Sequence, residues 1–405
     1  MPSKDYVLEL SHQYFLTKSP KRYRWLLLGI ILLGTCLRMP LTAIPPILDN
    51  IQQSFQLPAS LLGSLTTIPL LCFAALSPFI PRLASYLGNE VTILSALLLL
   101  TVGNFTRVLS AKWLLAGTLL LGIAIAFTNV LVPAIITDHF PDRVGPLTSL
   151  YTFSMTLFSA IGAGASAPLA AAFGWQGILQ SLAILTFIIT LAWLPNLRLN
   201  HHLQPPTLTA GKTSIWRTPG AWWMTLTMGI QSLLFYTILT WLPKIMLSRG
   251  VAQTTAGLML GLFQVAALPA AYLVPRYTTR VAHQRHLLWL IGLLFVCGLG
   301  GLLIPSHALW YLGLICILLG VASTSMFGLC MTLFSLKTTS AAETAAISGM
   351  AQALGYLLAA VGPVSFGLIY GWLHSWTLLL LALIGLAIAM IAAALIVERK
   401  ATIFD

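Results

Sequence analysis

The chain has 405 residues, of which 58% are hydrophobic and only 7% are charged, and its mean hydropathy is +0.91. Such values exclude a soluble globular domain and indicate a protein that is surrounded mostly by lipid. The formal net charge of +12 does not indicate nucleic-acid binding, because the basic residues are scattered between apolar stretches and are not interleaved with aromatic residues.

The first predicted element is a polar, basic N-terminal tail at residues 1–24, which lacks the apolar core and small-residue site of a cleavable signal peptide. A membrane-spanning segment needs about 20 largely apolar residues. Six such segments follow, near 25–49, 60–81, 91–110, 113–137, 146–170 and 175–195. We predict helices for all of them, because every backbone polar group must be paired within lipid.

A polar connector at 196–217, rich in His, Pro and Thr, separates these segments from a second set. The second set lies near 220–247, 254–275, 287–305, 308–334, 345–370 and 375–397, and a short tail covers 398–405. The predicted fold class is therefore an all-α membrane protein with twelve transmembrane helices, arranged as two six-helix halves at 25–195 and 218–397.

The basic residues predict the orientation, since Lys and Arg are enriched on the cytoplasmic side of a membrane. With a cytoplasmic N-terminus, sixteen Lys and Arg fall inside. Only Arg107, Lys112, Lys244 and Arg249 fall outside, and Arg38 lies within a span. Both termini are therefore predicted to be cytoplasmic.

The two halves repeat one another. Phe173-Gly174-Trp175 and Tyr370-Gly371-Trp372 are 197 residues apart, and Gly63 and Gly261, Gly122 and Gly320, and Ile44-Pro45 and Leu242-Pro243 are each 198 apart. Matches in chain order at a nearly constant offset indicate a duplicated six-helix unit. Two parallel six-helix repeats resemble the plan of the major facilitator fold, in which the substrate binds near mid-membrane between the halves and one half rocks against the other.

Arg38 lies near the middle of the first predicted helix, and no acidic residue occupies a comparable depth in any span. A lone cation at the bilayer centre costs a few kcal/mol or more, so such residues usually face a cavity and serve function. A guanidinium is a planar fork of donors suited to carboxylate, nitro or other oxyanion groups. We predict that Arg38 contacts an anionic or strongly electronegative ligand; the alternative is a structural Arg that binds carbonyl groups of a neighbouring helix.

Further polar and aromatic residues occupy related positions in the two halves; at the offset of 198, Arg38 corresponds to Tyr236 and Thr66 to Gln264. A few polar groups among rings are typical of pockets for small planar ligands. For a single Tyr or Gln the alternative is an interhelical hydrogen bond, and for Tyr151 an anchor at the membrane interface. The predicted substrate-binding residues are Arg38, Thr66, Asn129, Tyr151, Tyr236, Gln264, Phe327, Gln352 and Tyr356.

All nine acidic residues lie at helix ends, in loops or in tails, and no His lies in mid-span, so no mid-membrane proton carrier is predicted. Transport is expected to be uncoupled, driven by exchange, or linked to protons through Asp49, Asp138 or the substrate itself. The loops from Arg82 to Glu90 and from Asp138 to Arg143 carry opposite charges and are candidate latches that open as the halves rock. A solvated salt bridge within the loop is the alternative.

Other classes of site have no support in the sequence. The five cysteines are odd in number, lie in apolar stretches and have no CxxC spacing, so neither a disulfide nor a metal site is expected. No GxSxG, HExxH or Walker-type pattern is present, so we expect no enzyme activity and no cofactor. The expected partners are a small-molecule substrate and membrane lipid, with no nucleic acid, and the chain is expected to be a monomer.

Over residues 25–397 the chain resembles the cyanate permease and nitroimidazole transporter group of the major facilitator superfamily. The stretches that carry this resemblance are LRMPLTAIPPILD (37–49), LTTIPLL (65–71), TNVLVPAIITDHFP (128–141), IWRTPGAW (215–222), LTWLP (239–243) and SGMAQALGYLLAAVGP (348–363). Members of the group carry an Arg at the position of Arg38 and, more variably, an Asn at that of Asn129.

The resemblance implies an inner-membrane permease of small anions or nitroaromatic compounds. Uptake of a small organic anion and export of a nitro-heterocycle or other toxic planar compound are the two alternatives for its direction. A membrane sensor that binds without transport is a third, although the short tails leave no room for a signalling domain.

Overall fold

The computed structural model describes residues 20–140, 144–200, 215–338 and 341–403, and in these ranges the chain is helical, with no strand. The long helices arise because the spans are rich in Leu, Ala, Ile and Gly, and a lipid-facing backbone must pair all of its polar groups internally. The described helices give an all-α fold, as predicted.

The first predicted span is broken. Helix α2 (Pro20–Thr42) ends before the short 3-10 helix η1 (Pro45–Ile47), and α3 (Leu48–Phe55) continues at the far end. Pro45 and Pro46 explain the break, because proline lacks an N–H donor and disfavours helical geometry in the residue before it. The second span is bent by 70° between α4 (Ala59–Leu76) and α5 (Ile80–Leu87), where Pro78 and Pro81 flank the joint.

The remaining helices of the first half are α6 (Asn89–Thr106), α7 (Ala111–His139) and α8 (Val144–Trp193). Helix α8 contains both the fifth and the sixth predicted spans, and they meet at Gly174, whose φ of 73° and ψ of 162° are not helical. Glycine adopts such a conformation without the steric penalty of a side chain. The short 3-10 helix η3 (Leu194–Leu199) follows.

The second half begins after η4 (Ile215–Arg217). It consists of α9 (Pro219–Leu247), α10 (Gln253–Thr278), α11 (Arg285–Gly301), α12 (Leu309–Leu336), α13 (Ala341–Leu373) and α14 (Thr377–Arg399). Nine described helical segments are long and apolar enough to cross a membrane. The predicted count of twelve is reached when the bent pair α4–α5, the two arms of α8 and the 17-residue α11 are each counted as one span.

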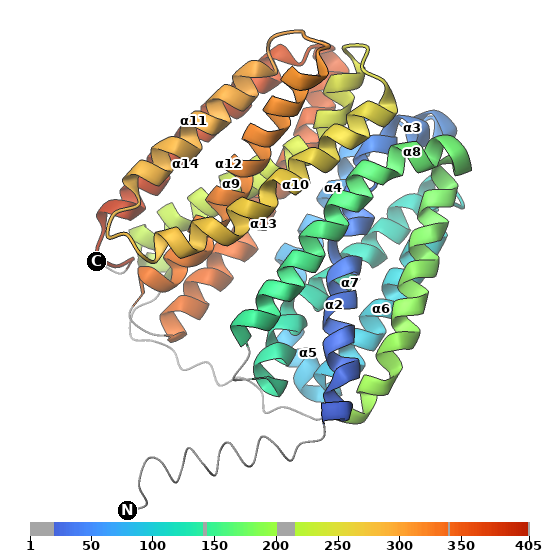
Figure 1. The fold of residues 1–405 in the computed structure, drawn as a ribbon, viewed down its shortest axis with the longest axis vertical. Helices are drawn as coiled ribbons and strands as arrows, with labels where there is room; N and C mark the ends of the chain where they lie inside the picture. Colours follow the sequence, from blue (N-terminus) through green and yellow to red (C-terminus); the bar gives the residue numbers. More distant parts are fainter. Residues whose placement is uncertain (1–19, 141–143, 201–214, 339–340, 404–405) are drawn as a thin grey trace, which may run out of the picture.

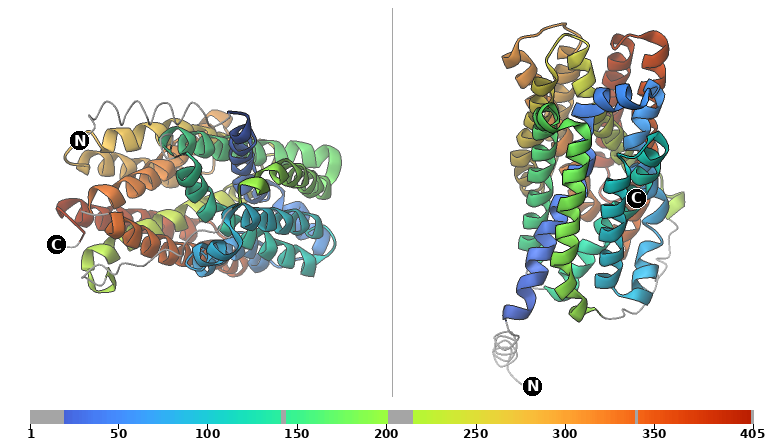
Figure 2. Two further views of the ribbon diagram at one scale, coloured as in Figure 1. Left: turned by 90° about the horizontal axis from the view of Figure 1, so that it is seen from below. Right: turned by 90° about the vertical axis from the view of Figure 1, so that its right-hand side faces the viewer.

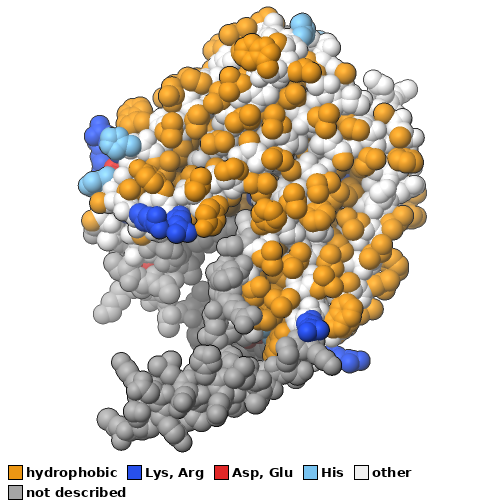
Figure 3. All heavy atoms as spheres, in the orientation of Figure 1, with side chains coloured by type: hydrophobic (Ala, Val, Ile, Leu, Met, Phe, Trp, Pro, Cys, Tyr) orange, Lys and Arg blue, Asp and Glu red, His pale blue; other side chains and the backbone are white. Residues whose placement is uncertain are grey.

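The two halves lie side by side as two bundles (Figures 1 and 2). We call the end at which α2 begins the lower end, and the end that carries α3 the upper end, as they appear in Figure 1. The bundles meet at the upper end and diverge toward the lower end (Figure 1). Hydrophobic side chains cover the broad face seen in Figure 3, and Lys and Arg side chains lie at its margins, as expected for a surface that faces lipid.

Two close helix crossings join the halves. Helix α4 packs on α13 where Gly63 faces the backbone of Pro363, and α8 packs on α10 where Gly164 faces Gly261. A Cβ atom at Gly63 would clash with the carbonyl group of Pro363, and one at Gly261 would lie 2.9 Å from the Cα of Gly164. Small residues at these positions allow the helix backbones to approach closely, which is how helices associate within lipid.

Candidate functional site

A cavity of about 70 Å³ lies between the two halves. Arg38 reaches it from α2, and the other lining side chains come from α8, α9, α10, α12 and α13. They are Thr152, Met155, Thr156, Gln231, Ser232, Phe235, Tyr236, Gln264, Ala267, Ala271, Ser323, Thr324, Phe327 and Tyr356. The site therefore combines one cation with rings, amides and hydroxyl groups.

The guanidinium of Arg38 lies over the ring of Phe235, with 5.5 Å between its central carbon and the ring centroid. Within the described parts of the chain, the side chain of Arg38 has no hydrogen bond and no ion pair. A cation–π contact stabilises a charge far less than a bidentate oxyanion does. The planar donor edge of Arg38 is thus left available to a ligand.

Three phenols surround the cation. Tyr151, Tyr236 and Tyr356 all lie close enough to Arg38 for its charge to act on them. The hydroxyl of Tyr151 is buried and has no hydrogen-bond partner among the described residues. A buried hydroxyl without a partner costs free energy, so a ligand that reaches Arg38 would also find a free donor there.

Amide groups close the cavity on the side of the second half. The Nε2 atom of Gln264 donates to the hydroxyl of Ser159 at 2.6 Å and so joins α10 to α8 across the two halves. Gln231 donates to the carbonyl oxygen of Ser323 at 3.0 Å, and its own Oε1 accepts from Ser232 at 3.2 Å. These bonds fix the orientation of both amides, which is a requirement for selective recognition.

The structure brings Arg38, Tyr236, Gln264, Phe327 and Tyr356 together in the cavity lining, and Tyr151 lies beside them. Three other predicted contacts lie elsewhere.

Thr66 is buried where the halves meet, with its hydroxyl 2.9 Å from that of Thr240. Gln352 donates to the hydroxyl of Ser348 at 2.8 Å, one turn away on α13. Asn129 is exposed on α7 and does not line the cavity.

Several lining residues were not predicted from the sequence. Gln231 carried the same signal as Gln264, an amide within a span, and could have been found in the same way. Phe235 carried no such signal in the sequence, because aromatic residues are common in apolar helices. Thr152 and Thr156 lie one helical turn apart on α8, and neither hydroxyl stands out from the many Ser and Thr of the chain.

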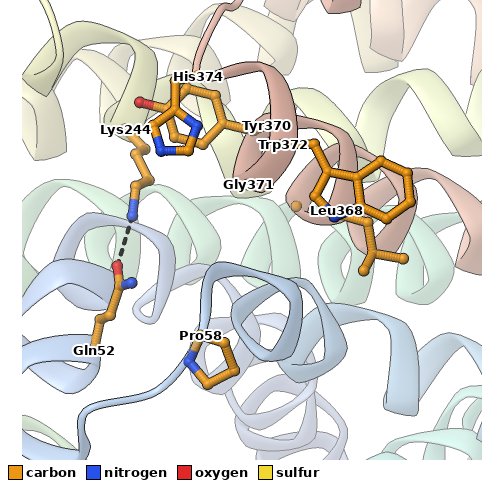
Figure 4. A pocket seen from close by; sticks show the side chains of 9 residues that line it. Gln52, Pro58, Lys244, Leu368, Tyr370, Gly371, Trp372 and His374 are labelled. Atoms are coloured by element: carbon orange, nitrogen blue, oxygen red, sulfur yellow. Dashed lines mark hydrogen bonds between the residues drawn. The ribbon is translucent and has the colours of Figure 1, made fainter.

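The upper end is closed by polar contacts between the halves. Lys244 of α9 lies 2.9 Å from the carboxylate of Asp49 and donates to the amide oxygen of Gln52 at 2.7 Å, both on α3. Gln253 donates to the carbonyl oxygen of Pro46 at 2.9 Å and also bonds Asn50. A pocket of about 440 Å³ adjoins these contacts, and Figure 4 shows the Gln52–Lys244 bond together with Tyr370, Trp372 and His374.

At the lower end, Glu90 does not pair with Arg82 in the described structure. Glu90 is fully buried and lies 2.7 Å from the Nε2 atom of His139, while Arg82 is exposed. Asp138 is 3.6 Å from the same His139 atom. The pair involves two helices of the first half, α6 and α7, and so does not link the halves. Arg143, the other predicted latch residue, lies outside the described residues.

No group of three or more His, Cys, Asp or Glu in the described ranges is arranged to hold a metal ion. All five cysteines are free, and four of them are buried.

A family model described as Major Facilitator Superfamily matches residues 26–363. The chain is 38% identical to "Uncharacterized transporter YycB" of Bacillus subtilis (strain 168), with 94% of this chain and 95% of the relative covered. It is also 38% identical to the "2-nitroimidazole transporter" of Escherichia coli (strain K12), with coverage of 90% and 93%. The "Cyanate transport protein CynX" of the same organism is 24% identical, with coverage of 90% and 95%.

Solved transporters share the fold at low sequence identity. A bacterial homolog of the human lysosomal transporter Spinster, in an inward-facing and occupied conformation, superposes with a TM-score of 0.70 at 16% identity, covering 94% of this chain and 96% of that chain. The nucleoside transporter NupG superposes with a TM-score of 0.75 at 12% identity, covering 92% and 100%.

Proposed function

The chain belongs to the major facilitator superfamily, and we propose that it moves a small anionic or strongly electronegative planar organic solute across the membrane by alternating access. Its family and its relatives are those of a secondary transporter and not of an enzyme. The observation that carries the proposal is the guanidinium of Arg38, which lines the central cavity, lies over the ring of Phe235 and has no ion pair with the described residues.

Charge supports an anionic or electronegative ligand. Among the described residues that line the cavity none is acidic, so a ligand with a carboxylate, nitro or similar group would supply the missing partner of Arg38. The aromatic lining favours a planar ligand, because a flat molecule can stack on the rings of Phe235, Tyr236, Phe327 and Tyr356. The printed names of two relatives, which mention 2-nitroimidazole and cyanate, are compatible with such solutes.

The excess of Lys and Arg at the lower end supports placing that end in the cytoplasm of a bacterial inner membrane. The contacts of Lys244 and Gln253 close the upper end between the halves, so we infer a state in which the path is shut on that side. In the alternate state the contacts of Lys244 and Gln253 would break and the lower ends would approach one another. Uptake and export use the same two states. Measuring whether cells that produce the protein accumulate or lose the solute would distinguish uptake from export.

The test is a thermal-shift titration of purified protein with small carboxylates and nitro-heterocycles. Arg38→Ala should weaken binding about 10- to 100-fold, because a hydrogen bond to a charged group contributes ~1.5–3 kcal/mol. The affinity of Arg38→Lys should lie between those of the wild type and Arg38→Ala, since an ammonium keeps the charge but not the planar fork of donors. Arg82→Ala, which removes an exposed Arg, is the matched control. A ligand whose affinity survives Arg38→Ala would place the site elsewhere.

A further inference from the structure

A second arginine lies at the upper end of the first half, away from the central cavity. Arg107 follows the last residue of α6 and is fully buried, as is Asn104 one turn before it. The Nη1 atom of Arg107 donates to the carbonyl oxygen of Pro40 on α2 at 3.4 Å. Arg107 was predicted to lie near the outer end of the span 91–110, and the structure places its charge inside the helix bundle.

Four buried polar atoms at this place have no partner in the described structure. They are Nε and Nη2 of Arg107 and the amide nitrogen and oxygen of Asn104. Residues three apart share a face of a helix, so the two side chains are neighbours. The Nε and Nη2 atoms form the two-donor edge with which a guanidinium holds an anion. Three of the four atoms are donors, namely Nε and Nη2 of Arg107 and the amide nitrogen of Asn104, and the amide oxygen of Asn104 is an acceptor.

No carboxylate in the described ranges is placed to neutralise Arg107. Among the described residues, Asp49 is the one acidic side chain at the upper end, and it is paired with Lys244 at 2.9 Å. Glu90 lies in the first turn of the same helix, α6, and is 17 residues or about 25 Å away along the helix axis. An unpaired buried charge costs several kcal/mol, and a guanidinium does not lose its proton to avoid that cost.

The surrounding helices are shaped to hold Arg107 where it is. A Cβ atom at Gly117 of α7 would lie 2.7 Å from the Cγ of Arg107, so glycine at that position makes room for the arginine stem. The site also touches the substrate path indirectly. Pro40, whose carbonyl group Arg107 binds, is two residues after Arg38 on α2.

We propose that Arg107 and Asn104 form a buried binding site for a small monovalent inorganic anion, such as a halide or nitrate. The anion accepts from Nε and Nη2 of Arg107 and from the amide of Asn104, and it neutralises the charge. A bound water would satisfy the donors but would leave the charge unbalanced. Occupancy of the site steadies the Pro40 contact and thereby the part of α2 that presents Arg38.

The experiment is a titration of purified protein, first exchanged into gluconate buffer, with chloride, bromide or nitrate at constant ionic strength. We expect a saturable rise in unfolding temperature. The rise should persist in Arg38→Ala, which lacks the cation of the central cavity, and should require at least tenfold more anion in Arg107→Gln and Asn104→Ala. The Arg38 variant separates this site from the proposed substrate site, so either can fail alone.

Three results would overturn the site: no saturable anion effect in the wild type, loss of the effect in Arg38→Ala, or an unchanged effect in both Arg107→Gln and Asn104→Ala. If Arg107→Gln does not fold, the proposal is tested by the anion response of Asn104→Ala and by the anomalous signal of bromide in crystals. Bromide density at the Nε–Nη2 edge of Arg107 supports the proposal, and its absence there at saturating bromide refutes it.

Discussion

In the proposed site, Phe235 and Arg38 form the contact on which ligand selection would depend, because the ring occupies the face of the guanidinium and leaves its edge free. A planar ligand can bind the edge of Arg38 and at the same time meet the ring. The cation–π contact contributes about 0.5–2 kcal/mol, depending on how dry the site is. Phe235 should therefore govern the preference for aromatic over aliphatic ligands more than it governs affinity for anions in general.

Phe235→Leu keeps an apolar side chain and removes the ring. We expect the affinity for nitro-heterocycles to fall about 3- to 30-fold, in line with the ~0.5–1.5 kcal/mol of an aromatic pair plus lost area, while that for acetate-sized carboxylates changes less than twofold. Isothermal titration of both ligand classes would measure the ratio. Equal losses for the two classes would mean that the ring positions Arg38 and does not contact the ligand.

Single residues were predictable from the sequence where their chemistry was unusual for a membrane span. Arg38 and Gln264 stood out as a charge and an amide in apolar surroundings, and both line the cavity. Arg107 did not stand out, because hydropathy placed it at the edge of a span and only tertiary packing buries it. Asn129 is also a polar residue in a predicted span, but it is exposed and is not among the residues that line the cavity.

At the scale of helices, the repeated glycines mark close crossings. Gly63 of α4 and Gly261 of α10 correspond at the repeat offset, and each makes one of the two contacts that join the halves. Gly122 and Gly320 also correspond, and they pack against α4 and α10 within their own halves. The repeat therefore preserves the points at which helix backbones touch.

Gly63→Ala should loosen the upper contact between α4 and α13, because the added Cβ meets the backbone of Pro363 and not a movable side chain. Overpacking of this kind costs about 1–3 kcal/mol, so the unfolding temperature should fall. Gly385→Ala is the matched control, since nothing lies within 4 Å of a Cβ there on α14, and it should be neutral or stabilising. Equal unfolding temperatures for the two variants would contradict this account.

The repeat predicts elements better than it predicts their ends. Trp175 donates to the hydroxyl of Ser54 at 2.8 Å, and its partner by sequence offset, Trp372, is 84% exposed. Trp376 makes the corresponding bond, to Ser248 at 3.0 Å. Loops can gain or lose residues without disturbing helix packing, so an offset measured near a loop shifts while the helices it joins stay equivalent.

At the scale of the whole molecule, the halves are held at the upper end by polar contacts that water can reach. The side chains of Asp49 and Lys244 are 32% and 14% exposed. A pair of this kind contributes up to about 1 kcal/mol, which shifts a two-state equilibrium roughly fivefold. The contact can therefore bias the conformation without locking it, as a carrier that must open requires.

Asp49→Lys should drive the upper ends apart by placing two cations together, and Asp49→Lys combined with Lys244→Asp should restore the closed distribution. Spin labels at Gln53→Cys and Ala252→Cys, in a chain without its five native cysteines, would report the distance between the upper ends. We expect a longer distance in the single variant and the wild-type distance in the double variant. A double variant that stays open would show that the charges do not interact across the halves.

In the proposed transport cycle, Arg38 would also make the carrier sensitive to voltage, because no acid lies beside it among the described lining residues. In the proposed orientation, with the upper end closed, the electric field would fall mainly across that end, and Arg38 would be at the potential of the cytoplasm. A negative interior therefore favours this state when the carrier is empty, by up to about 2.3 kcal/mol per 100 mV for a full charge. A bound monovalent anion cancels that charge. We expect membrane potential to hold the unloaded carrier open to the cytoplasm and to leave the loaded carrier free to turn over.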